Sequence, residues 1–409
     1  MDPTKYALTI SSEMKTIYEK TFYDARKAKE NKKVIAWVPQ FTPVEILYSM
    51  DIIPIIIEYY GIECAINYDK RFLNAAEKKG QSRDVCSYLN NIFGYVVEKE
   101  NLDNLPVGGL PDPDILIKAN TLCEDQTGIL GAISQYLKCP TFTMDVPIQS
   151  YTRNDCDIDS DLIEYYIFQL EDLIVWLEKY TRSKFNRDNL NKFLHYSDSV
   201  GKLIGEINEY RKAIPAPMNV NDAYTSLFFP WACMNPMSAA ELLKKVRDEV
   251  QFRVRNGIGA ISEEKYRLLW AFSPPWVNLG LINYFEKYGA IFCMENGICL
   301  SGGLTRMDPS KPLLSLSKKY LTGVTNRFEY DIDLIANLVK DYKIDGVVSM
   351  DQLSCKFISL GQVEMKKKLQ QEYGIPTLLI DMDHTDPSRY NDSQIKLQIE
   401  SFIEILEKK

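Results

Sequence analysis

The chain has 409 residues, of which 45% are hydrophobic, so it is long enough for two or three domains with substantial cores. Its formal net charge is -8 and its pI is near 5.2, which excludes the basic footprint of a protein that binds nucleic acid or an anionic membrane surface. No apolar run has the length of a membrane span, and the amphipathic N-terminus lacks the apolar stretch of a secretion signal, so we expect a cytoplasmic protein.

The N-terminal part of the chain alternates helix and strand patterns. In chain order we expect a lead-in helix at 1–30, a strand at 34–39, a helix at 43–50, a strand at 52–57, and helices at 69–80 and 82–96. Glu58 follows the second of these strands directly. Parallel sheets bind ligands at the carboxyl ends of their strands, so Glu58 is a candidate acid, base or substrate ligand. An ordinary surface glutamate is the alternative.

Two stretches of the chain have the same order of elements. Residues 114–145 and 345–383 each read as a strand, a cysteine, an amphipathic helix and a second strand that opens with Pro-Thr. Asp114 precedes Cys123 by nine residues, and Asp345 precedes Cys355 by ten. Each stretch also follows an apolar run that contains a Trp, VIAWVP and RLLWAFSPP. We infer an internal duplication of an α/β domain, with one cysteine in the first turn of each βαβ unit.

The region from 155 to 217 changes to long helices. An apolar stripe runs from Leu162 to Leu177 behind a cap at Asp159 or Ser160, and we expect it to pack between the two α/β domains. The sequence PAPMN at 215–219 then breaks the helical pattern.

The predicted fold is therefore α/β, with two duplicated Rossmann-like domains whose sheets are doubly wound and mostly parallel. The expected division is an N-terminal α/β domain with its lead-in helix at 1–154, a helical connector at 155–217 and a C-terminal α/β domain at 218–409. Within the last domain we expect helices at 221–229 and 236–255, a strand at 267–272, a helix at 276–288, a strand at 290–294, a Gly-rich loop at 301–303, a helix at 331–342, a strand at 346–350, a helix closed by Gly374 and the strand PTLLID.

Some chemistries are excluded by residue type. His195 and His384 are the only histidines, so one chain cannot build a multi-histidine zinc or iron site. His195 is expected to be packed or solvated. His384 follows Asp381 and Asp383 at a strand end, where it is a candidate ligand contact. The chain has no Walker A sequence and no G-x-G-x-x-G after a strand, so nucleotide binding is not expected.

The cysteines fall into two groups. Cys86, Cys123 and Cys355 each begin a predicted helix, where the helix N-terminus favours a thiolate. Three thiolates converging between two domains would hold a [4Fe–4S] cluster by three corners and leave one iron without a protein ligand. No C-x-x-C pair supports such a cluster, so the residues alone do not decide whether one is bound. The others are expected as buried small hydrophobes: Cys64, Cys139, Cys156, Cys233, Cys293 and Cys299.

Five segments carry a family resemblance, and they read SRDVCSYLNNIFG, PDILIKANTLC, IPAPMNVNDAY, SMDQLSCKFISL and IDMDHTDPSRYNDSQIKLQIESFIEIL. In this order, over nearly the whole chain, they resemble the 2-hydroxyacyl-CoA dehydratase family, which also contains benzoyl-CoA reductase subunits. The α-type dehydratase subunit is the best fit. The resemblance implies Cys86, Cys123 and Cys355 as cluster ligands and Glu58 as the active-site glutamate. It places Gln40 where the family has a serine in its first strand-end loop.

The chain departs from the family pattern at further positions. Asn90 stands where related subunits have an Arg after the first cluster cysteine, and Gln352-Leu353 replaces an Asn-Arg pair before the last one. Together with Gln40, these changes leave the cluster ligands in place, but the resemblance then does not fix which acyl-CoA is the substrate. The tail motif that ends at Asp386-Pro387 is kept, and we expect it to be structural.

The activity that the resemblance implies is an (R)-2-hydroxyacyl-CoA dehydratase, which eliminates water through a ketyl radical to give a 2-enoyl-CoA. It further implies a [4Fe–4S] cluster with three cysteine ligands and one open iron, a homologous β-type partner subunit, and a separate ATP-hydrolysing iron–sulfur activator that injects one electron. A benzoyl-CoA reductase-like subunit, which reduces an aromatic acyl-CoA, is one alternative. An iron–sulfur carrier or accessory protein, and a purely structural α/β protein, are the others.

Overall fold

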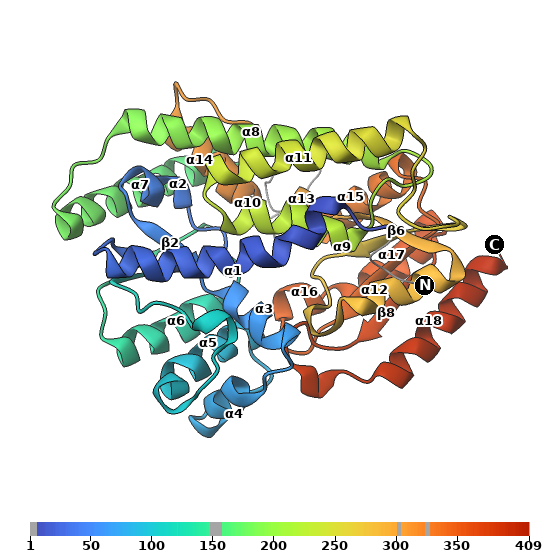
Figure 1. The fold of residues 1–409 in the computed structure, drawn as a ribbon, viewed down its shortest axis with the longest axis horizontal. Coiled ribbons are helices and arrows are strands. Elements are labelled where there is room, and N and C mark those ends of the chain that lie inside the picture. Colours follow the sequence, from blue (N-terminus) through green and yellow to red (C-terminus); the bar gives the residue numbers. More distant parts are fainter. Residues whose placement is uncertain (1–5, 121, 148–157, 301–303, 324–327, 409) are drawn as a thin grey trace.

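The computed structural model describes residues 6–120, 122–147, 158–300, 304–323 and 328–408. Within these ranges the chain forms two four-stranded parallel sheets, each with helices packed on both faces (Figure 1). The predicted α/β class is confirmed. The Gly-rich loop expected at 301–303 and Cys156 lie outside the described residues.

The first sheet has the strand order β2-β1-β3-β4, from strands β1 Ile35–Val38, β2 Ile53–Ile56, β3 Ile115–Ala119 and β4 Thr141–Met144. Successive residues of β1 face opposite cores: Ile35 and Trp37 pack on one side, Ala36 and Val38 on the other. All four are buried, as expected for a strand covered on both faces. The chain changes direction between β1 and β3, so the crevice at their carboxyl ends is the switch point of this sheet.

The second sheet repeats this order as β6-β5-β7-β8, from strands β5 Tyr266–Ala271, β6 Ala290–Glu295, β7 Gly346–Asp351 and β8 Thr377–Asp381. The two duplicated units also contain an equivalent hydrogen bond. The carboxylate of Asp114 accepts the backbone N–H of Ile35 at 2.8 Å, and that of Asp345 accepts the N–H of Arg267 at 2.8 Å. Each aspartate therefore ties the start of its third strand to the start of the central strand, which supports the predicted duplication.

The helices of the first half cover both faces of its sheet. Apolar residues of α3, α5 and α6 pack on one face and those of α2 on the other. The helices are α1 Thr9–Glu30, α2 Val44–Ser49, α3 Glu58–Ile66, α4 Arg71–Lys78, α5 Ser87–Glu98 and α6 Glu124–Leu137, with short 3₁₀ turns at Lys99–Asn101 and Pro106–Gly108.

The second sheet is covered in the same way. Helices α12 and α18 pack on one face, and α15 and α17 on the other. The elements are 3₁₀ turns at Trp276–Asn278, Glu286–Tyr288 and Pro387–Arg389 and helices α12 Gly280–Phe285, α13 Gly297–Leu300, α15 Phe328–Asp341, α16 Lys356–Ser359, α17 Gln362–Tyr373 and α18 Asp392–Glu407. One continuous helix was expected after Cys355, but Leu360 and Gly361 separate α16 from α17.

A set of long helices joins the halves, and Figure 1 shows α8 and α11 side by side along both of them. Their bounds are α7 Ser160–Thr181, α8 Arg187–Arg211, α9 Val220–Ala223, a π-helical turn Tyr224–Phe228, α10 Phe229–Cys233 and α11 Pro236–Arg255. Ile204 of α8 lies in one continuous apolar core with Trp37 of β1 and Trp270 of β5. The two sheets therefore share a core, and α8 and α11 complete it.

The stripe of α7 does not lie between the two sheets themselves. Helix α7 is capped by Asp159 as expected, and its buried residues pack on the first sheet and against α14, Pro312–Gly323, which belongs to the predicted C-terminal domain. The reason is that α2 has only 6 residues and leaves most of that sheet face to be covered by other helices.

Helix α14 comes from the second half of the chain, yet it is tied to the first half by a buried carboxylate. Glu45 of α2 accepts bonds from Lys319 Nζ at 2.6 Å, Tyr320 Oη at 2.7 Å and Ser197 Oγ at 2.7 Å. Burial disfavours the charged carboxyl, but the Lys319 ammonium and these hydrogen bonds outweigh it and hold the pKa of Glu45 below its ordinary value.

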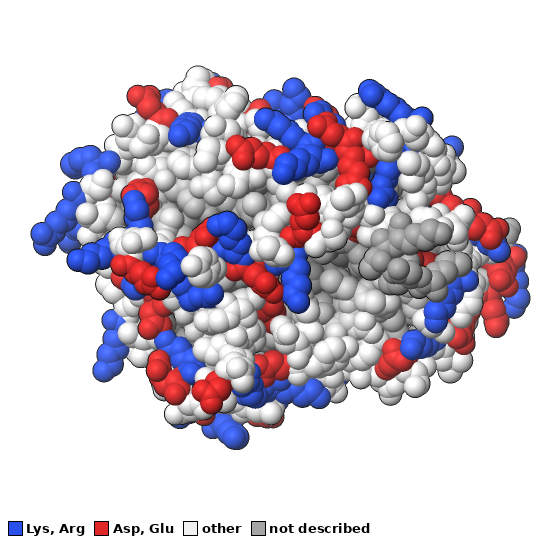
Figure 2. Space-filling model, viewed as in Figure 1, with Lys and Arg blue, Asp and Glu red and all other residues white. Residues whose placement is uncertain are grey.

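The surface carries charge of both signs. On the face in Figure 2, Lys and Arg side chains are interspersed with Asp and Glu side chains. None of the helices in the described ranges is both long enough and apolar enough to cross a bilayer.

The Glu45 contact predicts a large effect of a single substitution. Lys319→Met leaves a buried carboxylate without its counter-charge, so we expect the free energy of unfolding to fall by about 3–5 kcal/mol in urea titrations. Lys318→Met is the matched control, because Lys318 is exposed on the same helix, and it should change stability by less than about 0.5 kcal/mol. Equal effects of the two substitutions would contradict the role given to this ion pair.

Candidate functional site

A cavity of about 180 Å³ lies where the carboxyl ends of the two sheets face each other. We call it the inner cavity. Gln40 follows β1 and Glu58 follows β2 in the first sheet, while Phe272 and Ser273 follow β5 in the second, and all four line it. The site thus occupies the place at which open parallel sheets bind their ligands.

The three helix-starting cysteines meet at this cavity. Cys86 is the N-cap residue of α5, Cys123 of α6 and Cys355 of α16. All three line the inner cavity, and all three also line a second space of about 610 Å³, which we call the outer cavity. The cysteines therefore form a wall that the two cavities share.

Burial keeps these thiols neutral in the metal-free chain. It raises the pKa of Cys123 to about 11 and that of Cys355 to about 12. The pKa of Cys86 is raised well above its ordinary value by burial and then by the charges of Cys123 and Cys355, so the three sulfurs are close enough to repel one another as thiolates. Backbone N–H groups of the following helices act in the opposite direction on each pKa, without overcoming burial.

The three cysteines provide thiol donors at one wall of the inner cavity. Within the described ranges, no three His, Cys, Asp or Glu side chains are arranged to hold one metal ion. Three thiols around a shared wall are the donor type that iron–sulfur clusters use, and positive iron between them would offset both the burial penalty and their mutual repulsion.

Glu58 is the buried carboxyl of the inner cavity, with 6% of its surface exposed. Its two carboxylate oxygens each accept the backbone N–H of Gln40 at 3.1 Å, and Oε1 also accepts Nε2 of Gln126 at 3.0 Å. Burial raises the pKa of Glu58 to about 6, and these donors keep it from rising further. A carboxyl with this pKa is available in both protonation states near neutral pH.

Gln126 joins Glu58 to the cysteine loop of the first half. Its side-chain oxygen accepts the backbone N–H of Leu122 at 3.0 Å, next to Cys123. Gln40 donates its backbone N–H to Glu58 and also lines the cavity. The structure thus brings all five predicted site residues to one cavity.

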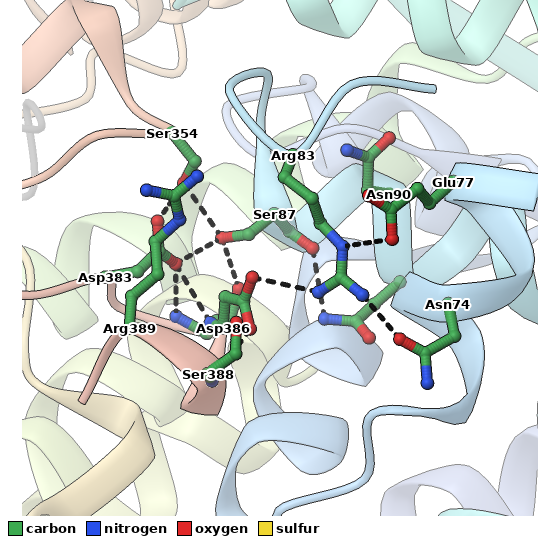
Figure 3. A network of polar contacts seen from close by, with 12 residues as sticks. Asn74, Glu77, Arg83, Ser87, Asn90, Ser354, Asp383, Asp386, Ser388 and Arg389 are labelled. Atoms are coloured by element: carbon green, nitrogen blue, oxygen red, sulfur yellow. Dashed lines mark hydrogen bonds and ion pairs between the residues drawn. The ribbon is translucent and has the colours of Figure 1, made fainter. Parts of the chain in front are cut away.

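A buried carboxylate connects the cysteine loops of the two halves (Figure 3). Asp383 accepts the hydroxyl of Ser87 at 2.7 Å on one oxygen and that of Ser354 on the other, and the two serine oxygens lie 3.0 Å apart. Ser87 follows Cys86 in the first half, and Ser354 precedes Cys355 in the second. We call this contact the Asp383 clamp, because it fixes the two cysteines relative to each other.

The profile of the family described as 2-hydroxyglutaryl-CoA dehydratase, D-component, matches residues 39–406. The chain belongs to this family. It is 25% identical over 405 residues to the (R)-2-hydroxyisocaproyl-CoA dehydratase alpha subunit of Clostridioides difficile, covering 95% of this chain and 94% of the relative.

Two further relatives show the breadth of the family. A benzoyl-CoA reductase subunit from Thauera aromatica is 26% identical over 356 residues, which cover 82% of this chain and 79% of the relative. The alpha subunit of lactoyl-CoA dehydratase from Anaerotignum propionicum is 24% identical over 402 residues, covering 94% and 93%. Because these relatives include both dehydratase and reductase subunits, family membership alone does not select the reaction.

Apart from Gln40, the departures from the family pattern do not line either cavity. Asn90 is buried one turn into α5, where its amide donates to the backbone oxygen of Ser82 at 2.7 Å. Gln352 is buried and Leu353 is 42% exposed, and neither lines the inner or the outer cavity.

The tail motif joins the halves instead of only closing the second one. Asp386 pairs with Arg83 of the first half at 2.9 Å (Figure 3). Arg389 pairs with Asp84 at 3.0 Å. These ion pairs flank the Asp383 clamp.

In the described ranges, neither the remaining cysteines nor His195 lines the inner cavity. Cys64 and Cys293 are buried in apolar cores, as expected, while Cys139, Cys233 and Cys299 are half-buried and pack against such cores. His195 is exposed on α8.

Tyr224 and Gln126 also line the inner cavity, and neither was predicted as a site residue. The only signal for Tyr224 was its place at the end of the motif IPAPMNVNDAY, and Gln126 gave none, since its role depends on contact with Glu58, 68 residues away.

The raised pKa of Glu58 predicts a pH-dependent stability. Between its ordinary value of 4.5 and the folded value of about 6, the folded state keeps the proton that the unfolded chain loses, so stability falls as pH rises through this window. In urea titrations of the cluster-free protein, the stability of wild type relative to Glu58→Gln should drop by about 2 kcal/mol from pH 4.5 to pH 7. A constant difference across this range would show that Glu58 is not held in a desolvated site.

Proposed function

We propose that this chain is the cluster-binding α-type subunit of an (R)-2-hydroxyacyl-CoA dehydratase. The main support for the proposal is that the five predicted site residues lie around the same cavity. Cys86, Cys123, Cys355, Glu58 and Gln40, which the family resemblance singles out from distant parts of the sequence, all line one inner cavity. The match of the family profile to residues 39–406 supports it.

The chain's own residues would divide the work. The three cysteines would hold a [4Fe–4S] cluster, which supplies one-electron chemistry and one open iron. Glu58 would take a proton from the substrate or give one to the departing hydroxyl, because its pKa of about 6 lets it do either near neutral pH. Aromatic side chains such as Tyr88, Phe228 and Trp276 line the cavity and would exclude water from a reactive intermediate.

The proposed assembly follows from the relatives, which are named as alpha subunits of dehydratases and as a subunit of a reductase. We infer a homologous β-type subunit that completes the active site and a transient ATP-dependent iron–sulfur activator that delivers the electron. A reductase-like subunit acting on an aromatic acyl-CoA is the second candidate, because the reductase relative is as similar to this chain as the dehydratases are.

The cluster is tested by iron and sulfide analysis with EPR on anaerobically purified protein. Wild type should contain about four irons per chain, and Cys86→Ala, Cys123→Ala and Cys355→Ala should each lose most of them. Cys139→Ala is the matched control, since Cys139 is half-buried but does not line either cavity. Wild type without iron after anaerobic reconstitution would overturn the proposal.

The reaction is tested by product analysis with an activator, ATP and reductant. A dehydratase converts (R)-2-hydroxyisocaproyl-CoA to the enoyl-CoA with electrons needed only in catalytic amount, whereas a reductase consumes them stoichiometrically with benzoyl-CoA. Glu58→Gln should retain its iron and lose about 10²–10⁴-fold in turnover. Full activity of this variant would remove Glu58 from the mechanism and favour an iron–sulfur carrier.

A further inference from the structure

His384 is a buried histidine whose ring nitrogens have no partner. It is 1% exposed, and neither Nδ1 nor Nε2 has a hydrogen-bond partner among the described residues. It lines the inner cavity together with Glu58 and the three cysteines, and its ring packs on that of Tyr88 with centroids 4.2 Å apart. A polar side chain in such a place is destabilising unless a ligand or water satisfies it.

The position of this ring is fixed by its neighbours along the chain. The preceding residue is the carboxylate of the Asp383 clamp, and the N–H groups of Thr385 and Asp386 bond back to that carboxylate at 3.0 and 2.9 Å (Figure 3). The backbone oxygen of His384 accepts the N–H of Val277 at 3.2 Å. The loop therefore holds the imidazole in the cavity wall.

The imidazole offers one donor and one acceptor. Burial lowers the pKa of His384, so the ring is neutral at physiological pH, with one N–H and one free ring nitrogen. A hydroxyl group is also both a donor and an acceptor, so it can satisfy either ring nitrogen.

Tyr224 adds a second unpaired group to the same cavity. Its side chain is 2% exposed, and its hydroxyl has no partner among the described residues. It begins the π-helical turn Tyr224–Phe228, and Phe228 at the end of this turn also lines the cavity. Turns of this kind are rare and occur often at functional sites.

We propose that His384 is a specificity-determining residue that hydrogen-bonds the 2-hydroxyl of the bound acyl group. The hydroxyl of Tyr224 would donate to the second oxygen of the substrate, the thioester carbonyl. A 2-hydroxyacyl thioester carries two oxygens beside each other. His384 and Tyr224 belong, with Tyr59, to the side chains around this cavity whose buried polar atoms have no hydrogen-bond partner among the described residues. A benzoyl group has only its carbonyl oxygen and would leave His384 unsatisfied. The inference rests on the proposed function, and it selects the dehydratase substrate class over the aromatic one.

The test is a binding measurement without turnover. The complex of this chain with its partner subunit is purified anaerobically, without activator, and titrated calorimetrically with (R)-2-hydroxyisocaproyl-CoA and with isocaproyl-CoA, which lacks only the hydroxyl. Wild type should bind the hydroxylated thioester at least about tenfold more tightly. His384→Leu should remove this preference, while His384→Gln, which keeps a donor and an acceptor, should retain most of it.

The controls separate the possible failures. His195→Leu removes the exposed histidine and should leave the preference unchanged. Iron content and thermal melting show whether His384→Leu is folded. If this variant does not fold, the wild-type measurement still tests the inference, because a wild type that does not prefer the hydroxylated thioester overturns it. Binding of both thioesters with equal affinity, or a preference that survives in His384→Leu, overturns the role of His384 and leaves the proposed function standing. Failure of wild type to bind either thioester overturns both.

Discussion

The geometry of the site depends on the buried carboxylate of Asp383. It accepts hydrogen bonds from serines on both halves of the chain, and each serine is next to a cysteine of the cavity wall. Apolar packing alone is poorly directional, so the shared core brings the two sheets together without setting the distance between particular side chains. Hydrogen bonds to one carboxylate do set it, because their lengths and angles are narrow. The Asp383 clamp thereby fixes the cysteine loops of the two halves relative to each other, so that their cysteines face one cavity.

Burial then acts on the ionisable groups of the inner cavity in a common direction. It raises the pKa of Glu58 and of the three cysteines and lowers that of His384, so each is shifted toward its neutral form. Asp383 is the exception. Burial disfavours its charge as well, but the charge interaction with His384 and the hydrogen bonds from Ser354, Ser87 and the N–H of Thr385 hold the pKa of Asp383 below its ordinary value. The neighbours of each group therefore decide whether burial leaves it neutral or charged.

Part of this structure could be read from the sequence. The eight strands of the described ranges follow from short apolar runs, and the duplication follows from the repeated order of Asp, strand, Cys and helix around Cys123 and Cys355. Because a strand end in a parallel sheet predicts a crevice, Glu58 and those cysteines could be expected near one another from the sequence alone.

Other features depend on distant partners and leave no local trace. The stripe of α7 shows that one face is buried but not which surface buries it, and α14 crosses to the first half through a contact 275 residues away from Glu45. The Asp383 clamp likewise joins Ser87 to a residue 296 positions later. Ordinary serines and aspartates carry no periodicity, so only the folded chain reveals them as partners.

The wall of cysteines has two sides with different character. The inner cavity is mostly aromatic and apolar, whereas the outer one is lined by charged residues that include Glu124, Asp125, Lys356 and Glu364. A group bound at this wall would therefore border an apolar space on one side and charged side chains on the other.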